Sequence, residues 1–268
     1  MRTSRLLFIP ILVLLCLGAG SVVAQAPRRI QSITLDGKPL AGFQYDKFKR
    51  LTRIESASES ECCNIITHIN YDRSGQLMSA GKYVDTKSTT PFLIEHRDYR
   101  LDIHNRVMEE KVERIDSVGR KMRPFQTRTF SYATPQDVLP NTEQVYDPAG
   151  RLLKEIIFIY NPTGAGADLE LYNHSGRLLE TQTLAFDPAH PMYHQNIPWV
   201  LRNWICIKCQ TPLTTLQLTR YDQEEAIEQQ ESYRYLTEYD AVGFPKRITV
   251  MDETKGRQFV FEFEYAQD

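Results

Sequence analysis

The sequence predicts an all-β fold, an antiparallel meander of about seven repeated hairpins that forms a strongly curved or barrel-like sheet. Three observations predict it. A seven-residue phrase recurs along the chain, the segments beside it alternate polar and apolar residues with the period of a strand, and helical periodicity is weak almost everywhere. A chain with these three features is expected to build one sheet from consecutive hairpins.

The recurring phrase is clearest in YDPAGRL at 146–152. Its copies begin at residues 45, 71, 101, 146, 172, 221 and 239. The first position is Tyr in six copies, the second is Asp or Asn in all seven, and the seventh is aliphatic in six. Steps of 26 residues, as between 45 and 71, suit one hairpin and its return strand.

Each position of the phrase suits the tip of a hairpin. Asp147 can accept hydrogen bonds from the backbone N–H groups just ahead of it. The fifth position must adopt a positive φ, which Gly150 does without cost and which Asn tolerates next best. We therefore expect Tyr146 to pair with Leu152 across the hairpin, and Asp147 to face Arg151.

The last residues of the chain predict a strand without an outgoing partner. In RQFVFEFEY (257–265), Phe259, Phe261, Phe263 and Tyr265 share one face, and Val260, Glu262 and Glu264 share the other. Seven hairpin tips imply about fifteen strands. An open flat sheet of that width is unusual, so the sheet is expected to curl or fold over on itself. Long steps in the repeat predict loop insertions at about 112–143 and 186–212.

Residues 1–24 have the pattern of a secretory signal peptide, with a basic start, an apolar run and a small-residue cleavage region that ends at Ala24. Residues 25–268 then form a single repeat domain that is exported to the periplasm, the cell surface or the medium. Of the 32 Lys and Arg, Arg2 and Arg5 fall in the leader, so 30 remain beside 34 Asp and Glu, a net charge of −4. This charge does not favour nucleic acid, and no later apolar run is long enough for a membrane-spanning helix.

The phrase Y-D-x-x-G-R-L resembles the YD repeat of Rhs-type proteins. The leader and the irregular spacing resemble small exported Bacteroidetes proteins of unknown function that are built from YD-like hairpins, some with a broad, porin-like curved sheet. The resemblance covers roughly 40–268. The chain departs from the phrase at Lys49 and Glu225, which replace the Gly, and at Phe244-Pro245, which replace Arg-Leu. The resemblance implies an architecture and supplies no catalytic residues.

Four cysteines follow the leader: Cys62, Cys63, Cys206 and Cys209. An even number in an exported chain favours disulfides, and three pairings are open. A bond between Cys62 and Cys63 would close a strained ring, so we favour two bridges between the two pairs. The alternative is a zinc site formed by His190, His194, Cys206 and Cys209, whose spacings within each pair suit zinc. Otherwise no cofactor is expected.

Aromatic residues supply the candidate binding site. Tyr193, Trp199 and Trp204 lie in the second insertion and do not belong to the repeat, so a loop that carries them either binds a partner or caps an edge of the sheet. The six repeat tyrosines have two interpretations. They either pack over the aliphatic residue opposite them, which the repeat itself explains, or form a row of rings that stacks on sugars.

Catalytic motifs are absent from the sequence. Carboxylate pairs such as Glu109 with Glu110, or Asp168 with Glu170, could serve a glycosidase, but spacing in a sheet does not select one pair. The favoured hypothesis is therefore a non-enzymatic exported binding or scaffold protein whose partner is a polysaccharide or an envelope protein. The alternatives are a secreted hydrolase with a carboxylate pair or zinc, and an outer-membrane β-barrel, which needs an unbroken apolar outer face.

Overall fold

The computed structural model describes residues 28–57, 63–86, 90–116, 121–161, 165–187 and 212–266. The described part of the chain contains no helix that is long and apolar enough to cross a membrane. Its strands are β1 (Ile30–Leu35), β2 (Lys38–Tyr45), β3 (Leu51–Ala57), β4 (Asn64–Tyr71), β5 (Leu77–Asp85), β6 (Phe92–Leu101), β7 (Val107–Ile115), β8 (Met122–Ser131), β9 (Thr142–Tyr146), β10 (Leu152–Tyr160), β11 (Gly166–Asn173), β12 (Leu178–Phe186), β13 (Leu213–Tyr221), β14 (Ile227–Tyr239), β15 (Pro245–Asp252) and β16 (Arg257–Tyr265).

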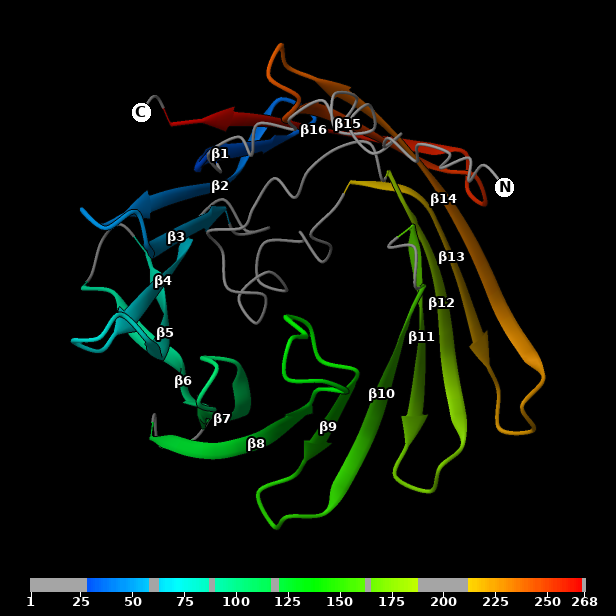
Figure 1. Ribbon diagram of the computed structural model, residues 1–268, viewed down its shortest axis with the longest axis horizontal. Helices are drawn as coiled ribbons and strands as arrows, with labels where there is room; N and C mark the ends of the chain where they lie inside the picture. The colour runs from blue at the N-terminus through cyan, green and yellow to red at the C-terminus, as the bar shows by residue number, and fades with distance from the viewer. Residues whose placement is uncertain are drawn as a thin grey trace, which may run out of the picture.

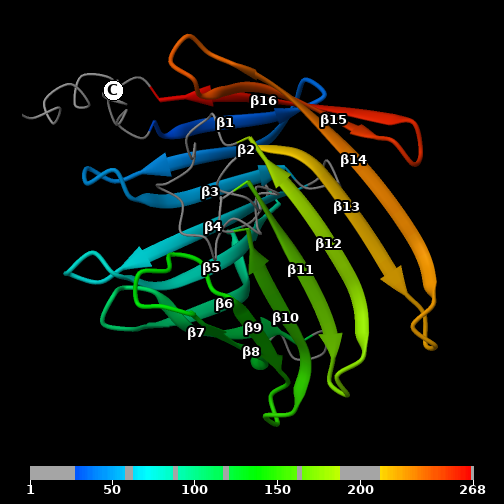
Figure 2. The same ribbon diagram turned by 45° about the vertical axis from the view of Figure 1, so that its right-hand side comes forward.

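The strands form one closed barrel in sequence order (Figure 1). Each pairs antiparallel with the next, and β16 closes the ring against β1, where Ile33 lies opposite Phe263. Figure 2 shows these two strands side by side at the top of the barrel. The all-β meander expected from the sequence is confirmed, and the terminal strand 257–265 finds its partner at the beginning of the chain.

Every copy of the phrase forms a hairpin tip. In each, the backbone N–H of the second residue donates to the carbonyl of the sixth over 2.8–2.9 Å, and the fifth residue has a φ between 60° and 90°. The positive φ holds even where the fifth residue is Lys49 or Glu225. Tyr146 pairs with Leu152 as expected. The Asp147 carboxylate accepts from the Arg151 guanidinium at 2.7 Å.

The first expected insertion is mostly regular structure. Residues 112–143 include the end of β7, all of β8 and the beginning of β9. Only 132–141, which joins β8 to β9, is a long loop among the residues described there. The hairpin of β8 and β9 was not predicted because its loop lacks the phrase. In addition, β8 contains Pro124, which lies at a register shift, where a strand tolerates proline. The second expected insertion falls largely at 188–211, outside the described residues.

The register divides the barrel wall into two faces. Ile54, Phe43 and Ile33 lie on one face and are almost fully buried. Since side chains on a single-layer wall crowd on its concave side, this is the inner face. The alternate residues form the outer face, which is rich in Ser, Thr, Glu, Asp, Lys and Arg; Ser32 donating to Glu264 is one of its cross-strand pairs.

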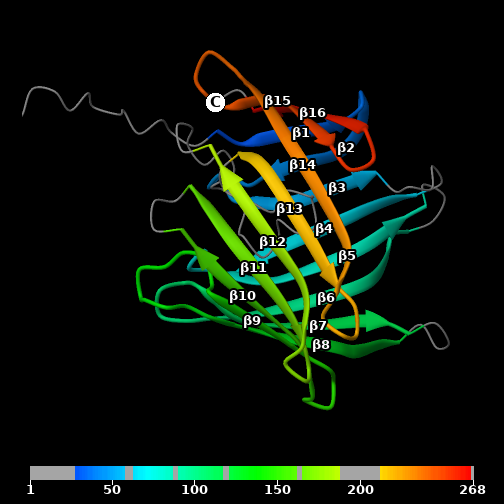
Figure 3. The same cartoon turned by 90° about the vertical axis from the view of Figure 1, so that its right-hand side faces the viewer.

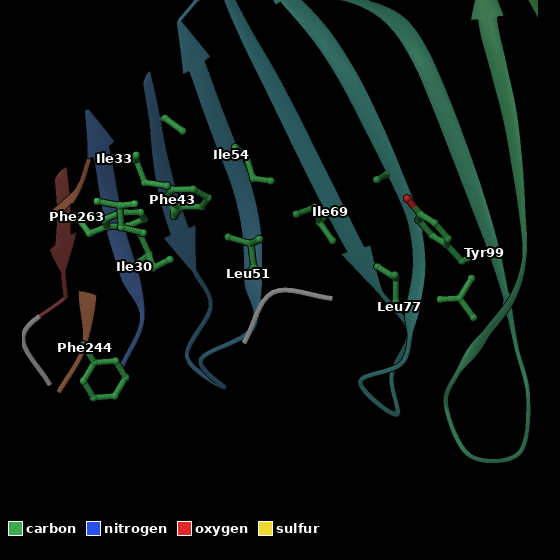
Figure 4. Close-up of a cluster of buried hydrophobic side chains, with 14 of the residues drawn as sticks. Ile30, Ile33, Phe43, Leu51, Ile54, Ile69, Leu77, Tyr99, Phe244 and Phe263 are labelled. Atoms are coloured by element: carbon green, nitrogen blue, oxygen red, sulfur yellow. The ribbon is translucent and has the colours of Figure 1, made fainter. Parts of the chain in front are cut away.

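The wall has two contrasting parts. The first wall, β1–β8 with β15 and β16, carries the hydrophobic core on its inner face, including Leu51 and Ile69 (Figure 4). The second wall, β9–β14, contributes no buried residue to that core. Its long strands lie slanted across the first wall in Figure 3. Among its described residues, the fully buried apolar side chains are Val145, Ala167 and Leu184.

The two ends of the barrel can be told apart by the turns they carry. At the first rim, β1 begins and β16 ends, and the turns are 46–50, 72–76, 102–106, 132–141 and 240–244. At the second rim the tight turns are 36–37, 147–151, 173–177, 222–226 and 253–256. Copies of the phrase therefore close both rims.

Candidate functional site

The aromatic and metal sites expected from the sequence lie outside the described residues. This applies to Tyr193, Trp199 and Trp204, to His190 and His194, and to Cys62, Cys206 and Cys209. Cys63 is described and is half-buried just before β4. The binding loop, the disulfide pairing and the zinc site thus stay predictions. Within the described ranges, no group of three or more His, Cys, Asp and Glu is placed to hold a metal ion.

A chain of ion pairs crosses the inner face of the first wall. The Arg97 guanidinium donates to Glu95 at 2.6 Å and to Glu110 at 2.9 Å. The other oxygen of Glu110 accepts from Arg128 at 2.6 Å, and Arg128 also donates to Glu143 at 2.8 Å. Glu110 has no exposed surface. Because a buried charge without a partner is very costly, this alternation of Arg and Glu is what lets the charges lie inside.

The ion pairs leave these carboxylates poorly suited to catalysis. Burial alone would raise the pKa of Glu95, but Arg97 and Arg114 outweigh it and hold the pKa below its usual range. A general acid needs the opposite shift. Tyr99 lies directly opposite Glu110, and burial together with that carboxylate raises the pKa of its phenol well above the usual value. The cluster is therefore a structural ladder of charges.

The two carboxylate pairs considered from the sequence are placed differently in the wall. Glu109 and Glu110 are neighbours on one strand, so they point to opposite faces of the wall. Glu109 faces outward and pairs with Arg100 and Lys111. Asp168 accepts from the hydroxyl of a threonine on the next strand at 2.7 Å. The strand geometry therefore separates Glu109 from Glu110, whereas Asp168 and Glu170 share the outer face, and a catalytic role of that pair stays a prediction.

The second wall has its own inner polar cluster near the second rim. Arg220 donates to Glu180 and to Gln229, each at 3.1 Å. Gln229 donates to Glu231 at 2.8 Å, and Glu231 also accepts from the hydroxyl of Tyr233 at 2.9 Å. The Arg220 side chain is 44% exposed. This cluster is consequently more open to solvent than the ladder of the first wall.

The repeat tyrosines at the first rim point inward. Tyr45 and Tyr71 each lie two residues after a buried residue of the inner face and therefore share that face. Their hydroxyls donate to the backbone carbonyls of Ile30 and Leu51, each at 2.9 Å. In both cases the acceptor is the first residue of the preceding strand. Tyr265 makes the equivalent bond to Pro245 at 2.8 Å. These tyrosines link neighbouring hairpins, which is the structural interpretation of the repeat.

The repeat tyrosines at the second rim point outward. Tyr146, Tyr172 and Tyr221 each follow a residue of the inner face and are half-buried. Their hydroxyls bond to outer side chains. Tyr146 donates to Gln144 at 2.7 Å, Tyr172 donates to Glu170 at 2.7 Å, and Tyr221 lies 3.3 Å from the Thr181 hydroxyl. The same phrase thus presents its ring to the interior at one rim and to the exterior at the other.

Backbone handedness explains this exchange. With L-residues, a hairpin of fixed turn type always carries its first-position side chain on the same face relative to the turn direction and the order of strands. Turning such a hairpin upside down within the barrel, with the strand order kept, moves that side chain from the inside to the outside. The loop 132–141 closes the first rim without the phrase, so the next copy closes the second rim. Strand β14 then connects the copy at 221–227, at the second rim, directly to the copy at 239–245, which therefore lies at the first rim again.

The outer tyrosines form a candidate binding surface, the tyrosine strip, defined as Tyr146, Tyr172 and Tyr221. Glu155 lies between the first two, opposite Tyr172 in the register, and accepts from Gln144 at 2.7 Å. The sequence predicted the row of tyrosines but not which of them face outward. That depends on the number of strands between copies of the phrase, which the loop 132–141 conceals.

The charge ladder was also missed. Its signal in the sequence is the alternation of Glu95, Arg97 and Tyr99 in EHRDY, which places one acid, one base and one phenol on the same face of β6. Polar residues at alternate positions of a strand normally face solvent, so this pattern could not show that these charges lie inside.

No protein family and no curated protein matches the chain. A solved porin-like protein from Bacteroides vulgatus ATCC 8482 is similar to it, with a TM-score of 0.52 and 8% identity over 90% of this chain and 100% of that chain. A porin-like protein from Bacteroides uniformis ATCC 8492 has a TM-score of 0.46 and 11% identity, covering 90% and 99%. A DUF3836 family protein from Parabacteroides distasonis ATCC 8503 has a TM-score of 0.26 and 10% identity, covering 42% and 93%.

The likeness to the B. vulgatus protein shows a shared fold, the barrel. In architecture it agrees better with the outer-membrane barrel alternative than with a general scaffold. At 8% identity it carries no chemistry from one protein to the other. The chemistry of the wall itself must therefore decide between the functions.

Proposed function

We propose that this protein is an exported, non-catalytic β-barrel of the bacterial envelope that acts by binding, with its outer face in water. The observation that carries the proposal is the polarity of the two faces. Apolar side chains and paired charges lie inside the first wall, whereas charged and hydroxyl side chains are frequent on the outside, beside exposed apolar residues of the second wall such as Ile159 and Leu236. An outer-membrane barrel has the reverse arrangement, with an apolar band facing lipid and a polar interior.

Charges at mid-strand on the outer face support contact with water. Lys111 lies at the middle of β7 and pairs outside with Glu109 at 3.5 Å. Arg234, within β14, pairs outside with Glu253 at 3.1 Å. A lysine or arginine that faces lipid at the bilayer midplane costs about 2–4 kcal/mol, so several such residues would make insertion of this wall strongly unfavourable.

Binding is favoured over catalysis because the inner carboxylates are held in ion pairs. Glu95, Glu110 and Glu143 each accept from at least one arginine. The oxygens of these carboxylates are already engaged by guanidinium groups, whereas a glycosidase needs a carboxyl group that contacts its substrate. The zinc version of the hydrolase alternative depends on residues outside the described ranges.

A second candidate is an outer-membrane barrel. It is favoured by the closed even-numbered barrel and by the porin-like description of the B. vulgatus protein. Cell fractionation separates the two candidates. The full chain is expressed with its own leader in a Gram-negative host, and membranes are washed with alkaline carbonate. We expect the protein in the soluble fraction or released by carbonate; retention in washed membranes, with extraction by detergent alone, would favour the second candidate.

A further inference from the structure

We propose that the tyrosine strip binds a neutral, linear polysaccharide along the outside of the second wall. This deepens the proposed function and rests on it, because the strip can reach such a chain only if the outer face lies in water. The strip is formed by Tyr146 at the end of β9, Tyr172 near the end of β11 and Tyr221 at the end of β13.

The rings of the strip are half-buried, and their hydroxyls contact other side chains of the outer face. The hydroxyls of Tyr146 and Tyr172 bond to Gln144 and Glu170, two residues back on the same strand. Such a bond directs each hydroxyl back along its own strand. The Tyr221 hydroxyl meets Thr181, which lies opposite the residue two before Tyr221 on β13. Three half-buried tyrosines thus have their hydroxyls held by outer-face side chains.

The spacing of the rings suits a polymer with a repeating unit. They stand on alternate strands of one sheet, which places them roughly 10 Å apart across the strands, since neighbouring strands lie about 4.8 Å apart. A linear polysaccharide presents the flat C–H face of a sugar ring at regular intervals. Such faces pack well on aromatic rings, which combine apolar area with a polar end.

Polar groups beside the rings can bond to sugar hydroxyls. Glu155 and Glu170 flank Tyr172 on either side, and Gln144 and Thr181 lie next to the other rings. Carboxylates and amides held by one hydrogen bond retain further acceptor or donor capacity. The strip therefore offers both components of sugar recognition, a stacking face and a polar border.

The charge of the strip selects a neutral polymer. The pKa of the Tyr172 phenol is raised by its hydrogen bond to Glu170, by burial and by the negative charges of Glu170, Glu155 and Glu225. An acidic border repels a polyanion at close range. A polysaccharide of uronic acids or sulfated sugars is therefore disfavoured.

The repeat does not account for these rings as it does for those of the first rim. Tyr45 and Tyr71 are also half-buried, but they pack against the hydrophobic core and bond to the backbone of a neighbouring strand. The outer tyrosines make no such backbone bond among the contacts described, and Ile227, paired with Tyr221, is 59% exposed. The outward rings are consequently free to contact a partner.

Affinity electrophoresis of the folded protein tests the proposal. The gels contain one of three neutral polysaccharides (a linear β-glucan, a mannan or amylose) or one of two polyanions (polygalacturonate or heparin). We expect retardation by at least one neutral polymer and by neither polyanion. Replacing Tyr172→Ala together with Tyr146→Ala should weaken the retardation at least tenfold, whereas Tyr172→Phe, which keeps the ring, should retain it within about threefold.

The matched control is Thr34→Ala, which changes the outer face of the first wall, and each variant is checked for a native unfolding transition. Failure of the folded wild type to bind any neutral polymer would overturn the proposal, as would binding to polyanions alone or binding unaffected by the double substitution. Carbonate fractionation is scored separately. A soluble barrel without polysaccharide binding refutes the strip and leaves the proposed function standing.

Discussion

The two walls of the barrel use one repeated phrase in opposite ways. At the first rim, Tyr71 and Leu51 face inward, where the ring hydroxyl bonds to the backbone and the leucine has no exposed surface. At the second rim, Tyr172 and Leu178 face outward and are half-buried. The difference shows that the phrase determines the turn and the handedness of the hairpin but not whether its side chains are buried. Burial follows from the rim at which the turn happens to lie.

This contrast also divides the stability of the molecule. The first wall holds a continuous core and most of the charge ladder, while the described side chains of the second wall are mostly half-buried or exposed, apart from a few such as Glu143, Val145 and Leu184. A substitution should therefore cost much more at a first-wall position than at the equivalent second-wall position. Paired substitutions test this expectation, beginning with the largest effect.

The largest difference is expected between two glutamates. Glu110→Gln should lower the free energy of unfolding by about 3–5 kcal/mol, because it removes the buried carboxylate that accepts from both Arg97 and Arg128, and a hydrogen bond to a charged group contributes about 1.5–3 kcal/mol. Glu180→Gln should cost less than about 1 kcal/mol, because its partner Arg220 is 44% exposed. Urea unfolding followed by tryptophan fluorescence measures both. Equal losses would contradict the division into two walls.

The next comparison concerns the aliphatic position of the phrase. Leu51→Ala should destabilise the protein by about 2–5 kcal/mol, since it creates a cavity at a fully buried site. Leu178→Ala should cost less than about 1 kcal/mol, because Leu178 lies half-buried on the outer face. Thermal unfolding by circular dichroism gives the two values. A larger loss at Leu178 would show that the faces are assigned the wrong way round.

A smaller effect is expected from the tyrosine hydroxyls. Tyr71→Phe removes the bond to the Leu51 carbonyl and should cost about 1 kcal/mol. Tyr172→Phe removes a bond between two outer side chains and should change stability by less than about 0.5 kcal/mol. The same unfolding measurement compares them, and indistinguishable values would remove the structural role given to the inward hydroxyl.

The smallest effect is a pH dependence. Burial raises the pKa of Tyr71 to about 12, above the value of about 10 expected in the unfolded chain. The stability that this group contributes is thus complete below pH 10 and is lost as the pH rises toward 12. Ultraviolet titration should show a late tyrosinate phase that coincides with unfolding. Tyr71→Phe should reduce its amplitude by one tyrosine, and an unchanged late phase would argue against burial of this ring.

Much of the fold could be predicted from the sequence because the hairpin is a local object. Asp147 and Gly150 determine their turn through backbone hydrogen bonds and φ alone, so the expected pairing of Tyr146 with Leu152 is found. Even Lys49 keeps the positive φ, because the turn imposes it.

The orientation of each hairpin could not be predicted in the same way. It depends on every strand between two copies of the phrase, and β8 lay within a segment, 112–143, that the sequence marked as an insertion. The charge ladder escaped notice for a related reason. Glu95 and Arg97 have the spacing of any polar strand face, and their burial follows only from closure of the barrel.

The most direct test of the central claim is tyrosine nitration of the native protein with tetranitromethane, mapped by peptide mass spectrometry. If the phrase faces outward at the second rim, Tyr146, Tyr172 and Tyr221 should be modified, while Tyr45, Tyr71 and Tyr265 stay protected until the protein is unfolded. Modification of both groups at equal rates, or protection of the second-rim tyrosines alone, would contradict the reversal of the hairpins between the two rims.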